Sequence, residues 1–182
     1  MLHMFLANGF EEIEAITTLD ILKRLGLEVK TITITGARLI RGAHGIPVMA
    51  DALFRKNDID DSQGLILPGG MPGASNLFRH EGLRKELVQH NDRGTVIAAI
   101  CAAPMILGRN GLLKGRRATC YPGFEKYLAG AECTGELVTC DGNIITGLGP
   151  AAAVAFAMAI GEKFVDAGKI EALQNDMCFR HK

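Results

Sequence analysis

The feature that most constrains the fold is a strand, a helix and a second strand in succession at the start of the chain. Residues 2–7 are a short, mostly apolar run that ends in a turn at Asn8-Gly9. Residues 11–25 repeat apolar side chains at helical spacing, and residues 29–35 are rich in the β-branched side chains typical of strands. This order favours a parallel sheet, because the helix returns the chain to the edge where a parallel strand must begin. The apolar side chains predicted on or near one face of this helix are Ile13, Ile16, Leu19 and Leu22.

The rest of the chain continues the same alternation. Residues 64–67 and 95–100 are predicted strands, and the second is the most apolar of them, as expected for a central strand covered on both faces. The glycine-rich segment 36–50 is predicted to be loop with a short strand near Val48. Short strands are also expected at residues 118–120, 137–140 and 143–146, and helices at residues 83–90, 102–107, 151–160 and 164–173. The sequence therefore predicts one α/β domain over residues 1–182, an open and mostly parallel sheet with helices on both faces.

Charge and cysteine content limit the classes of function. Lys plus Arg and Asp plus Glu each total 20, so the basic excess of a nucleic-acid-binding protein is missing. A net charge of zero is also compatible with self-association. The 5 cysteines form no CxxC pair, and their odd number favours reduced thiols over a disulfide framework. No run reaches the ~20 apolar residues of a membrane helix, and no secretion signal is evident. We therefore expect a cytoplasmic protein with no nucleic-acid or membrane partner.

Cys101 is the strongest candidate for a reactive side chain. It directly follows the most apolar strand and precedes a predicted helix, which is the arrangement of a nucleophile elbow. A helix N-terminus carries positive potential, so the pKa of this thiol is expected to be lowered. The alternative is that Cys101 is a small buried apolar side chain, which is the commonest role of a free cysteine.

Glu14 is the second candidate, in the first turn of the first predicted helix. Its neighbours Ile13 and Ala15 are apolar, and the carboxyl ends of parallel strands meet at one edge of the sheet. A carboxyl group buried beside the sulfur would have a raised pKa and could donate a hydrogen bond to it. The alternative is that Glu14 only favours the positive end of the helix, as Glu11 and Glu12 would.

The remaining candidates are backbone groups and one aromatic ring. Gly69-Gly70 is either a simple tight turn or a loop that presents the N–H of Gly70, together with that of Ala102, as an oxyanion hole. The loop lacks the spacing of phosphate-binding motifs. The 5 histidines show no metal-ligand spacing, so we predict no metal and no cofactor. His80 and His90 are predicted to lie on the surface of a polar helix.

Taken together, these segments resemble the ThiJ/PfpI superfamily in its DJ-1-like branch. The matching segments are Gly9 to Ala15, Leu67 to Gly70, Ala98 to Pro104, and Gly149-Pro150 before an Ala-rich helix. They occur in the order of that family and span nearly the whole chain. The resemblance implies a flavodoxin-like three-layer α/β/α sandwich and a homodimer.

The resemblance also implies residue roles. Cys101 would be the reactive cysteine, Glu14 the protonated glutamate that touches its sulfur, and Gly70 and Ala102 the oxyanion donors. Two positions depart from relatives that carry a histidine near the cysteine, because Tyr121 stands before Pro122 and Ala102 follows Cys101. A Cys–His dyad for peptide hydrolysis is therefore missing, and a peptidase or amidotransferase is the least favoured function. An arginine of some relatives is replaced by His44 in this alignment.

Two functions remain open from the sequence. The first is a cofactor-free enzyme of the glyoxalase or deglycase type, which would act on a small carbonyl such as methylglyoxal through Cys101 and Glu14. Gly69, Gly70, Ala102 and Tyr121 would line its substrate site. The second is an oxidative-stress sensor or chaperone-like protein that is switched by oxidation of Cys101.

Overall fold

The computed structural model describes residues 1–55 and 59–179, and its centre is a 7-stranded sheet in the order β10-β11-β7-β6-β1-β2-β5. All neighbouring strands in this sheet are parallel except β10 and β11, which pair antiparallel. The strands are β1 (Leu2–Leu6), β2 (Val29–Thr33), β5 (Ala52–Leu53), β6 (Gly64–Leu67), β7 (Val96–Ile100), β10 (Val138–Asp141) and β11 (Ile144–Gly147).

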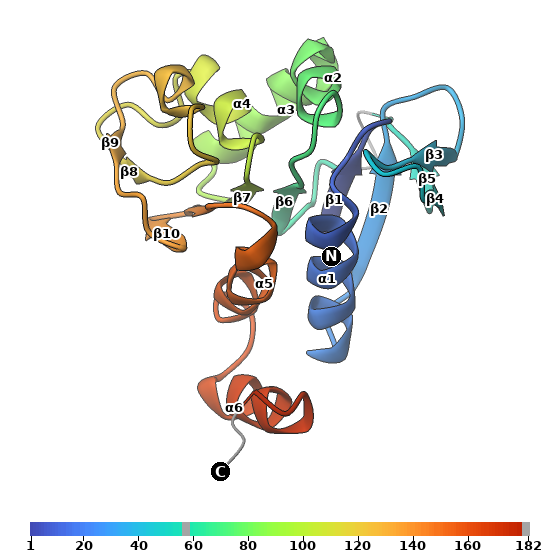
Figure 1. Ribbon diagram of the computed structural model, residues 1–182, viewed down its shortest axis with the longest axis vertical. Helices are drawn as coiled ribbons and strands as arrows, with labels where there is room; N and C mark the ends of the chain where they lie inside the picture. Colours follow the sequence, from blue (N-terminus) through green and yellow to red (C-terminus); the bar gives the residue numbers. More distant parts are fainter. Residues whose placement is uncertain (56–58, 180–182) are drawn as a thin grey trace.

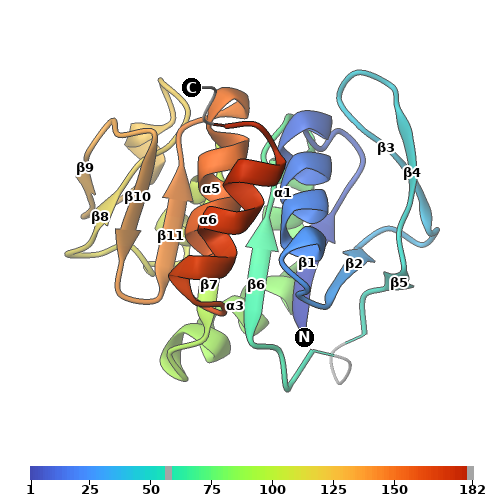
Figure 2. The same ribbon diagram turned by 90° about the horizontal axis from the view of Figure 1, so that it is seen from below.

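Helices cover both faces of the sheet, so the molecule has three layers (Figures 1 and 2). On one face lie α1 (Glu12–Arg24), α5 (Ala153–Gly161) and α6 (Ala167–Asp176). On the other lie α2 (Gly73–Arg79), α3 (Glu81–Asp92) and α4 (Pro104–Arg109). The predicted α/β/α sandwich is thereby confirmed. No helix among the described residues has the length and apolar content needed to cross a bilayer.

Two small sheets lie outside the main one. The hairpin of β3 (Leu39–Arg41) and β4 (Pro47–Met49) occupies the segment predicted to be mostly loop. At the other end of the molecule, β8 (Arg117–Ala118) pairs with β9 (Glu132–Cys133). Residues 118–120 were predicted to form a strand; only Ala118 does so, and it pairs outside the main sheet. Two short 3-10 helices, η2 (Glu125–Tyr127) and η3 (Pro150–Ala152), complete the described elements.

The core confirms the prediction for residues 95–100. Strand β7 lies inside the sheet between β6 and β11, and Ile97 to Ile100 are fully buried. A strand in this position is covered by helices on both faces, which is why its sequence shows no polar alternation. The carboxyl ends of β1, β6 and β7 therefore meet at one edge of the sheet.

The predicted apolar face of α1 is partly wrong, because Leu22 is buried and Leu19 packs against the core but Ile13 and Ile16 do not. Ile13 and Ile16 are 56% and 42% exposed, whereas Glu14 and Thr18 are buried. The helix is turned so that this polar pair, four residues apart, lies against the interior together with Ala15. Periodicity predicted the helix, but polar contacts at the strand ends decide which face is buried.

His90 is also misplaced by the sequence prediction. Its side chain is fully buried, on the inward face of α3 with Leu83, Glu86 and Leu87. Burial lowers the pKa of His90. His80 is half-buried and accepts a hydrogen bond from the backbone N–H of Leu83 at 3.0 Å, so it caps the N-terminus of α3.

Candidate active site

Cys101 stands on a sharp turn directly after β7. Its φ angle is +63°, a left-handed conformation that side chains other than glycine rarely adopt. The backbone is fixed on both sides, since the N–H of Cys101 donates to Gly147 O at 2.9 Å and the N–H of Tyr121 donates to Cys101 O at 2.9 Å. This is the elbow predicted from the sequence, with one difference: α4 begins at Pro104 instead of directly after Cys101.

Glu14 faces the same turn from α1. Its side chain is fully buried, and its Oε2 accepts a hydrogen bond from the N–H of Gly69 at 2.7 Å. Its Oε1 is buried and, among the described residues, has no partner in full hydrogen-bond geometry. The Cys101 thiol nevertheless lies close enough to lower the pKa of Glu14 by hydrogen bonding. The carboxyl group and the thiol are therefore near enough to exchange a proton.

Gly69 separates these two side chains and must lack one itself. A Cβ atom at this position would lie 2.6 Å from Cys101 Cβ and 2.7 Å from Glu14 Oε2. Both distances are below any normal contact, so only glycine allows the cysteine and the glutamate to meet. The Gly69-Gly70 sequence is therefore more than a simple turn.

Burial dominates the protonation of the pair. It raises the pKa of Glu14 to about 7, against the opposing effect of hydrogen bonds from Cys101 and from the N–H of Gly69. Burial also raises the pKa of the Cys101 thiol, and the charge of Glu14 and the hydrogen bond between Cys101 and Glu14 raise it further, to about 12. The prediction of a lowered thiol pKa is therefore wrong for the state with Glu14 ionised, because Cys101 is only 8% exposed and lies beside a carboxylate.

The backbone N–H groups of Gly70 and Ala102 lie near the Cys101 sulfur and oppose the rise of its pKa. Gly70 has a φ angle of +83°, and a Cβ there would collide with the backbone N of Glu11, so the loop approaches α1 closely. Backbone donors from two separate segments thus lie beside the sulfur to which a substrate carbonyl would be bound, which is where an oxyanion hole would be needed.

Tyr121 contacts Cys101 through its backbone, because its N–H donates to Cys101 O. Its side chain is 47% exposed, and its ring lies over Gly149, where a Cβ would be 3.3 Å from the ring carbon Cδ2. An open, mostly apolar cavity of about 270 Å³ lies here, lined by Tyr121, Pro122, Leu137, Leu148 and the turn 149–152. Cys120 is buried, and burial raises the pKa of its thiol to about 12.

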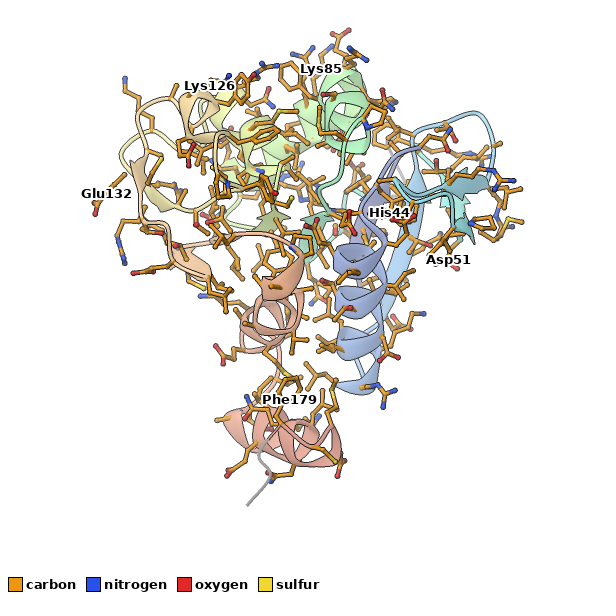
Figure 3. The ribbon with its side chains drawn as sticks, in the orientation of Figure 1. His44, Asp51, Lys85, Lys126, Glu132 and Phe179 are labelled. Atoms are coloured by element: carbon orange, nitrogen blue, oxygen red, sulfur yellow. The ribbon has the colours of Figure 1, made fainter. Side chains whose placement is uncertain are left out.

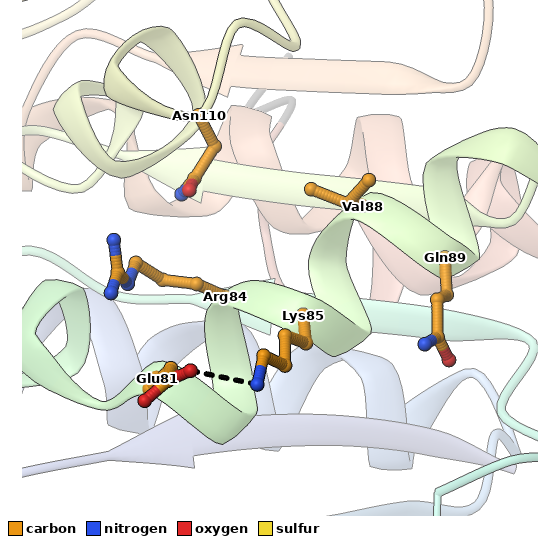
Figure 4. A pocket seen from close by; sticks show the side chains of 6 residues that line it. All are labelled: Glu81, Arg84, Lys85, Val88, Gln89 and Asn110. Atoms are coloured by element: carbon orange, nitrogen blue, oxygen red, sulfur yellow. Dashed lines mark ion pairs between the residues drawn. The ribbon is translucent and has the colours of Figure 1, made fainter.

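A separate cavity of about 360 Å³ lies on the outer side of α3 (Figure 4). Its polar walls include Arg84, Gln89 and Asn110, and an ion pair of 2.7 Å joins Glu81 Oε1 to Lys85 Nζ. None of the candidate active-site residues lines it.

The structure adds His44, on the β3–β4 hairpin, to the surroundings of α1 (Figure 3). Its Nδ1 lies 2.8 Å from Glu12 Oε2 and 3.7 Å from Glu11 Oε1. The sequence suggested only that the two glutamates favour a helix end, since the hairpin that brings His44 to them was predicted as loop.

Comparison with known proteins supports the fold and shows the family of this chain. Residues 2–163 match the model of the DJ-1/PfpI family. Protein DJ-1 homolog B of Arabidopsis thaliana is 37% identical over 92% of this chain, which spans 38% of that longer protein. A Pyrococcus horikoshii protein named as a deglycase is 33% identical over 80% of this chain and 87% of its own.

Among solved structures, Toxoplasma gondii DJ-1 in an oxidized form superposes with a TM-score of 0.92 at 30% identity. The match covers 99% of this chain and 98% of that one. The chain therefore belongs to the DJ-1/PfpI family.

Proposed function

We propose that the protein converts small reactive carbonyl compounds, methylglyoxal among them, by cofactor-free glyoxalase or deglycase chemistry at Cys101. The observation that carries this proposal is the meeting of Cys101 and the buried Glu14 across Gly69, with the backbone N–H groups of Gly70 and Ala102 near the sulfur. A nucleophile, a proton acceptor with a pKa near neutrality and two hydrogen-bond donors are the components of carbonyl addition. The deglycase name of the Pyrococcus relative agrees with it.

The first step is addition of sulfur to the aldehyde carbon. The thiol transfers its proton to the Glu14 carboxylate as the carbon–sulfur bond forms, so a free thiolate never has to accumulate. The aldehyde oxygen becomes an alkoxide near the N–H groups of Gly70 and Ala102, and protonation gives a hemithioacetal.

The second step moves a proton between the two carbons of the adduct. Glu14 removes the proton from the former aldehyde carbon and returns one to the neighbouring carbon. The hydroxyl proton on the former aldehyde carbon passes to the oxygen of the neighbouring carbon, which gives a thioester of lactate. Water then cleaves the carbon–sulfur bond and restores the Cys101 thiol. Methylglyoxal and water thus become lactate, with no external oxidant or reductant. We expect slow turnover, because Glu14 serves every proton transfer.

Methylglyoxal consumption with lactate detection tests this proposal. Wild type is compared with Cys101→Ala, Glu14→Gln and the control Cys140→Ala, whose cysteine is exposed on the edge strand β10. The proposal predicts activity in wild type and the control and loss in the other two. Full activity of Cys101→Ala would overturn it.

A second candidate function is redox sensing by the same cysteine. The N–H groups of Gly70 and Ala102 that contact the sulfur would also bind sulfinate oxygens, and a protonated Glu14 could donate to them. Each peroxide molecule that transfers one oxygen to sulfur is reduced to water. Intact mass and peptide mapping after mild peroxide should show two added oxygens at Cys101 first, and equal oxidation of all cysteines would contradict this function.

We also propose that the protein is a cytoplasmic homodimer. The 5 cysteines are all free thiols, as a reducing compartment favours. Ile13 and Ile16 place an exposed apolar surface on α1, and the zero net charge offers little repulsion between copies.

A further inference from the structure

The open cavity lined by Tyr121 adjoins the turn that carries Cys101. Tyr121 forms part of its wall and donates its backbone N–H to Cys101 O at 2.9 Å. On the other side of the turn, the N–H of Cys101 donates to Gly147 O at 2.9 Å. Leu148, which follows Gly147 in the chain, also lines the cavity. The two segments that fix the backbone of Cys101 therefore continue into the walls of this cavity.

The side chains of the cavity wall are almost entirely apolar. Among the residues that line it, Tyr121 alone has a polar side-chain atom, and none carries a charge. A charged or hydroxylated group placed here would lose its water and find few hydrogen-bond partners in return. An alkyl or aryl group would instead leave water without such a cost. The wall therefore favours an apolar ligand group.

Two large side chains of this wall are exposed to solvent. Tyr121 is 47% exposed and Leu137 is 49% exposed. Single exposed apolar side chains are ordinary on a protein surface, but these two line the same hollow beside the reactive cysteine. An apolar group bound in the cavity would cover part of both.

The volume of the cavity sets the size of this group. We take the ~30 Å³ that one water molecule occupies in the liquid as the space of one non-hydrogen atom, so about 270 Å³ holds roughly nine such atoms. The methyl group of methylglyoxal would fill about a tenth of this space. An isobutyl group would fill roughly half of it, and a phenyl ring about two-thirds.

We propose that this cavity binds the substituent of the carbonyl substrate, and that the preferred substrates are α-oxoaldehydes with a branched alkyl or aryl group in place of methyl. This inference rests on the proposed function and adds its substrate class. Leu137 and Leu148 are then residues that determine specificity, and the chemistry at Cys101 is unchanged. Isobutylglyoxal and water become 2-hydroxy-4-methylpentanoate, just as methylglyoxal and water become lactate.

The test compares kcat/KM for isobutylglyoxal and for methylglyoxal in wild type, Leu137→Ser and Leu148→Ser. Leu39→Ser is the matched control, because Leu39 is 53% exposed and lies on β3, at the opposite end of the molecule from β10 (Figure 2). The measured quantity is the ratio of the two kcat/KM values. The intrinsic reactivity of each aldehyde is the same in every variant, and partial unfolding lowers both values equally, so neither effect changes how the ratio compares between proteins.

We expect wild type to prefer isobutylglyoxal by about tenfold or more, since each buried methylene contributes up to about fourfold. The ratio should fall at least about fivefold in Leu137→Ser and in Leu148→Ser and stay at the wild-type value in Leu39→Ser. A ratio that is unchanged in both cavity variants would overturn the inference, while loss of both activities in Cys101→Ala would still support the proposed function.

Two other outcomes would also count against the inference. If Leu137→Ser becomes a monomer in analytical ultracentrifugation and its ratio is unchanged, the exposed leucine belongs to a contact between copies of the chain. If wild type converts neither aldehyde, the proposed function and its substrate class fail together.

Discussion

Replacement of Glu14 by glutamine should remove a pH-dependent loss of stability. The amide has the shape of the carboxyl group and keeps an oxygen for the N–H of Gly69, but it cannot ionise. Burial raises the pKa of Glu14 from 4.5 to about 7, so the folded state holds this proton more tightly than the unfolded state does. The stability that follows is complete below pH 4.5 and is lost as the pH rises through 7.

The magnitude follows from the two pKa values. A shift of about 2.5 units at about 1.4 kcal/mol per unit corresponds to roughly 3 kcal/mol in full. Between pH 5 and pH 8 the expected part is roughly 2–3 kcal/mol, a large fraction of the ~5–15 kcal/mol that stabilises an ordinary domain. Relative to wild type, Glu14→Gln should therefore gain about that much stability over this range.

Urea unfolding of both proteins at pH 5, 6, 7 and 8 measures this difference. Titrating groups that do not interact with Glu14 contribute equally to the two proteins and cancel when one free energy of unfolding is subtracted from the other, and the Cys101 thiol stays protonated in wild type over this pH range. An equal dependence of the free energy of unfolding on urea concentration (the m value) in the two proteins verifies that both expose the same surface area on unfolding. A difference that does not change with pH would show that Glu14 ionises in the folded protein without cost, and would refute its assignment as a neutral-pH proton carrier.

Three further outcomes are expected. Because addition requires an ionised Glu14, kcat/KM for methylglyoxal should rise with pH through about 7 and level off above it, whereas a flat profile from pH 6 to 8 would exclude Glu14 as the base. Gly69→Ala should cost about 1–3 kcal/mol and lower the activity by more than ~10-fold, because a Cβ would push Cys101 and Glu14 apart. Gly36→Ala, with nothing within 4 Å of its Cβ, should do neither, and equal effects would contradict the contact argument. Ile13→Glu should give a monomer in analytical ultracentrifugation, and an unchanged sedimentation coefficient would place the dimer interface elsewhere.

The elements that could be predicted from the sequence are the strands covered by helices on both faces of the sheet. The run before Cys101 could be placed in the centre of the sheet because a strand covered by two helical layers has no polar alternation. The same logic located the elbow, since a cysteine that follows such a strand lies at its carboxyl end. Short edge elements such as β5, with 2 residues, carry no comparable pattern and were missed.

Orientation and protonation were harder to predict, for physical reasons. The buried face of α1 depends on Glu14 meeting Gly69, a contact between residues 55 positions apart that helical periodicity does not contain. His90 lies in a polar helix but turns inward with Leu83 and Leu87. The pKa of Cys101 depends on burial in three dimensions, and that effect outweighs a helix that begins only at Pro104.

The first turn of α1 places Glu11 and Glu12 against the hairpin and Glu14 against Cys101. Because a helical turn is a rigid unit, any substitution that shifts its backbone displaces both groups of side chains at once. Amino-acid changes in this turn must therefore preserve two contacts at once, the one with the hairpin and the one with Cys101. The wall formed by Tyr121 and Leu148 belongs to other segments and carries no such double constraint. Changes of substrate preference, by selection or by design, should accumulate on that wall and leave the three glutamates untouched.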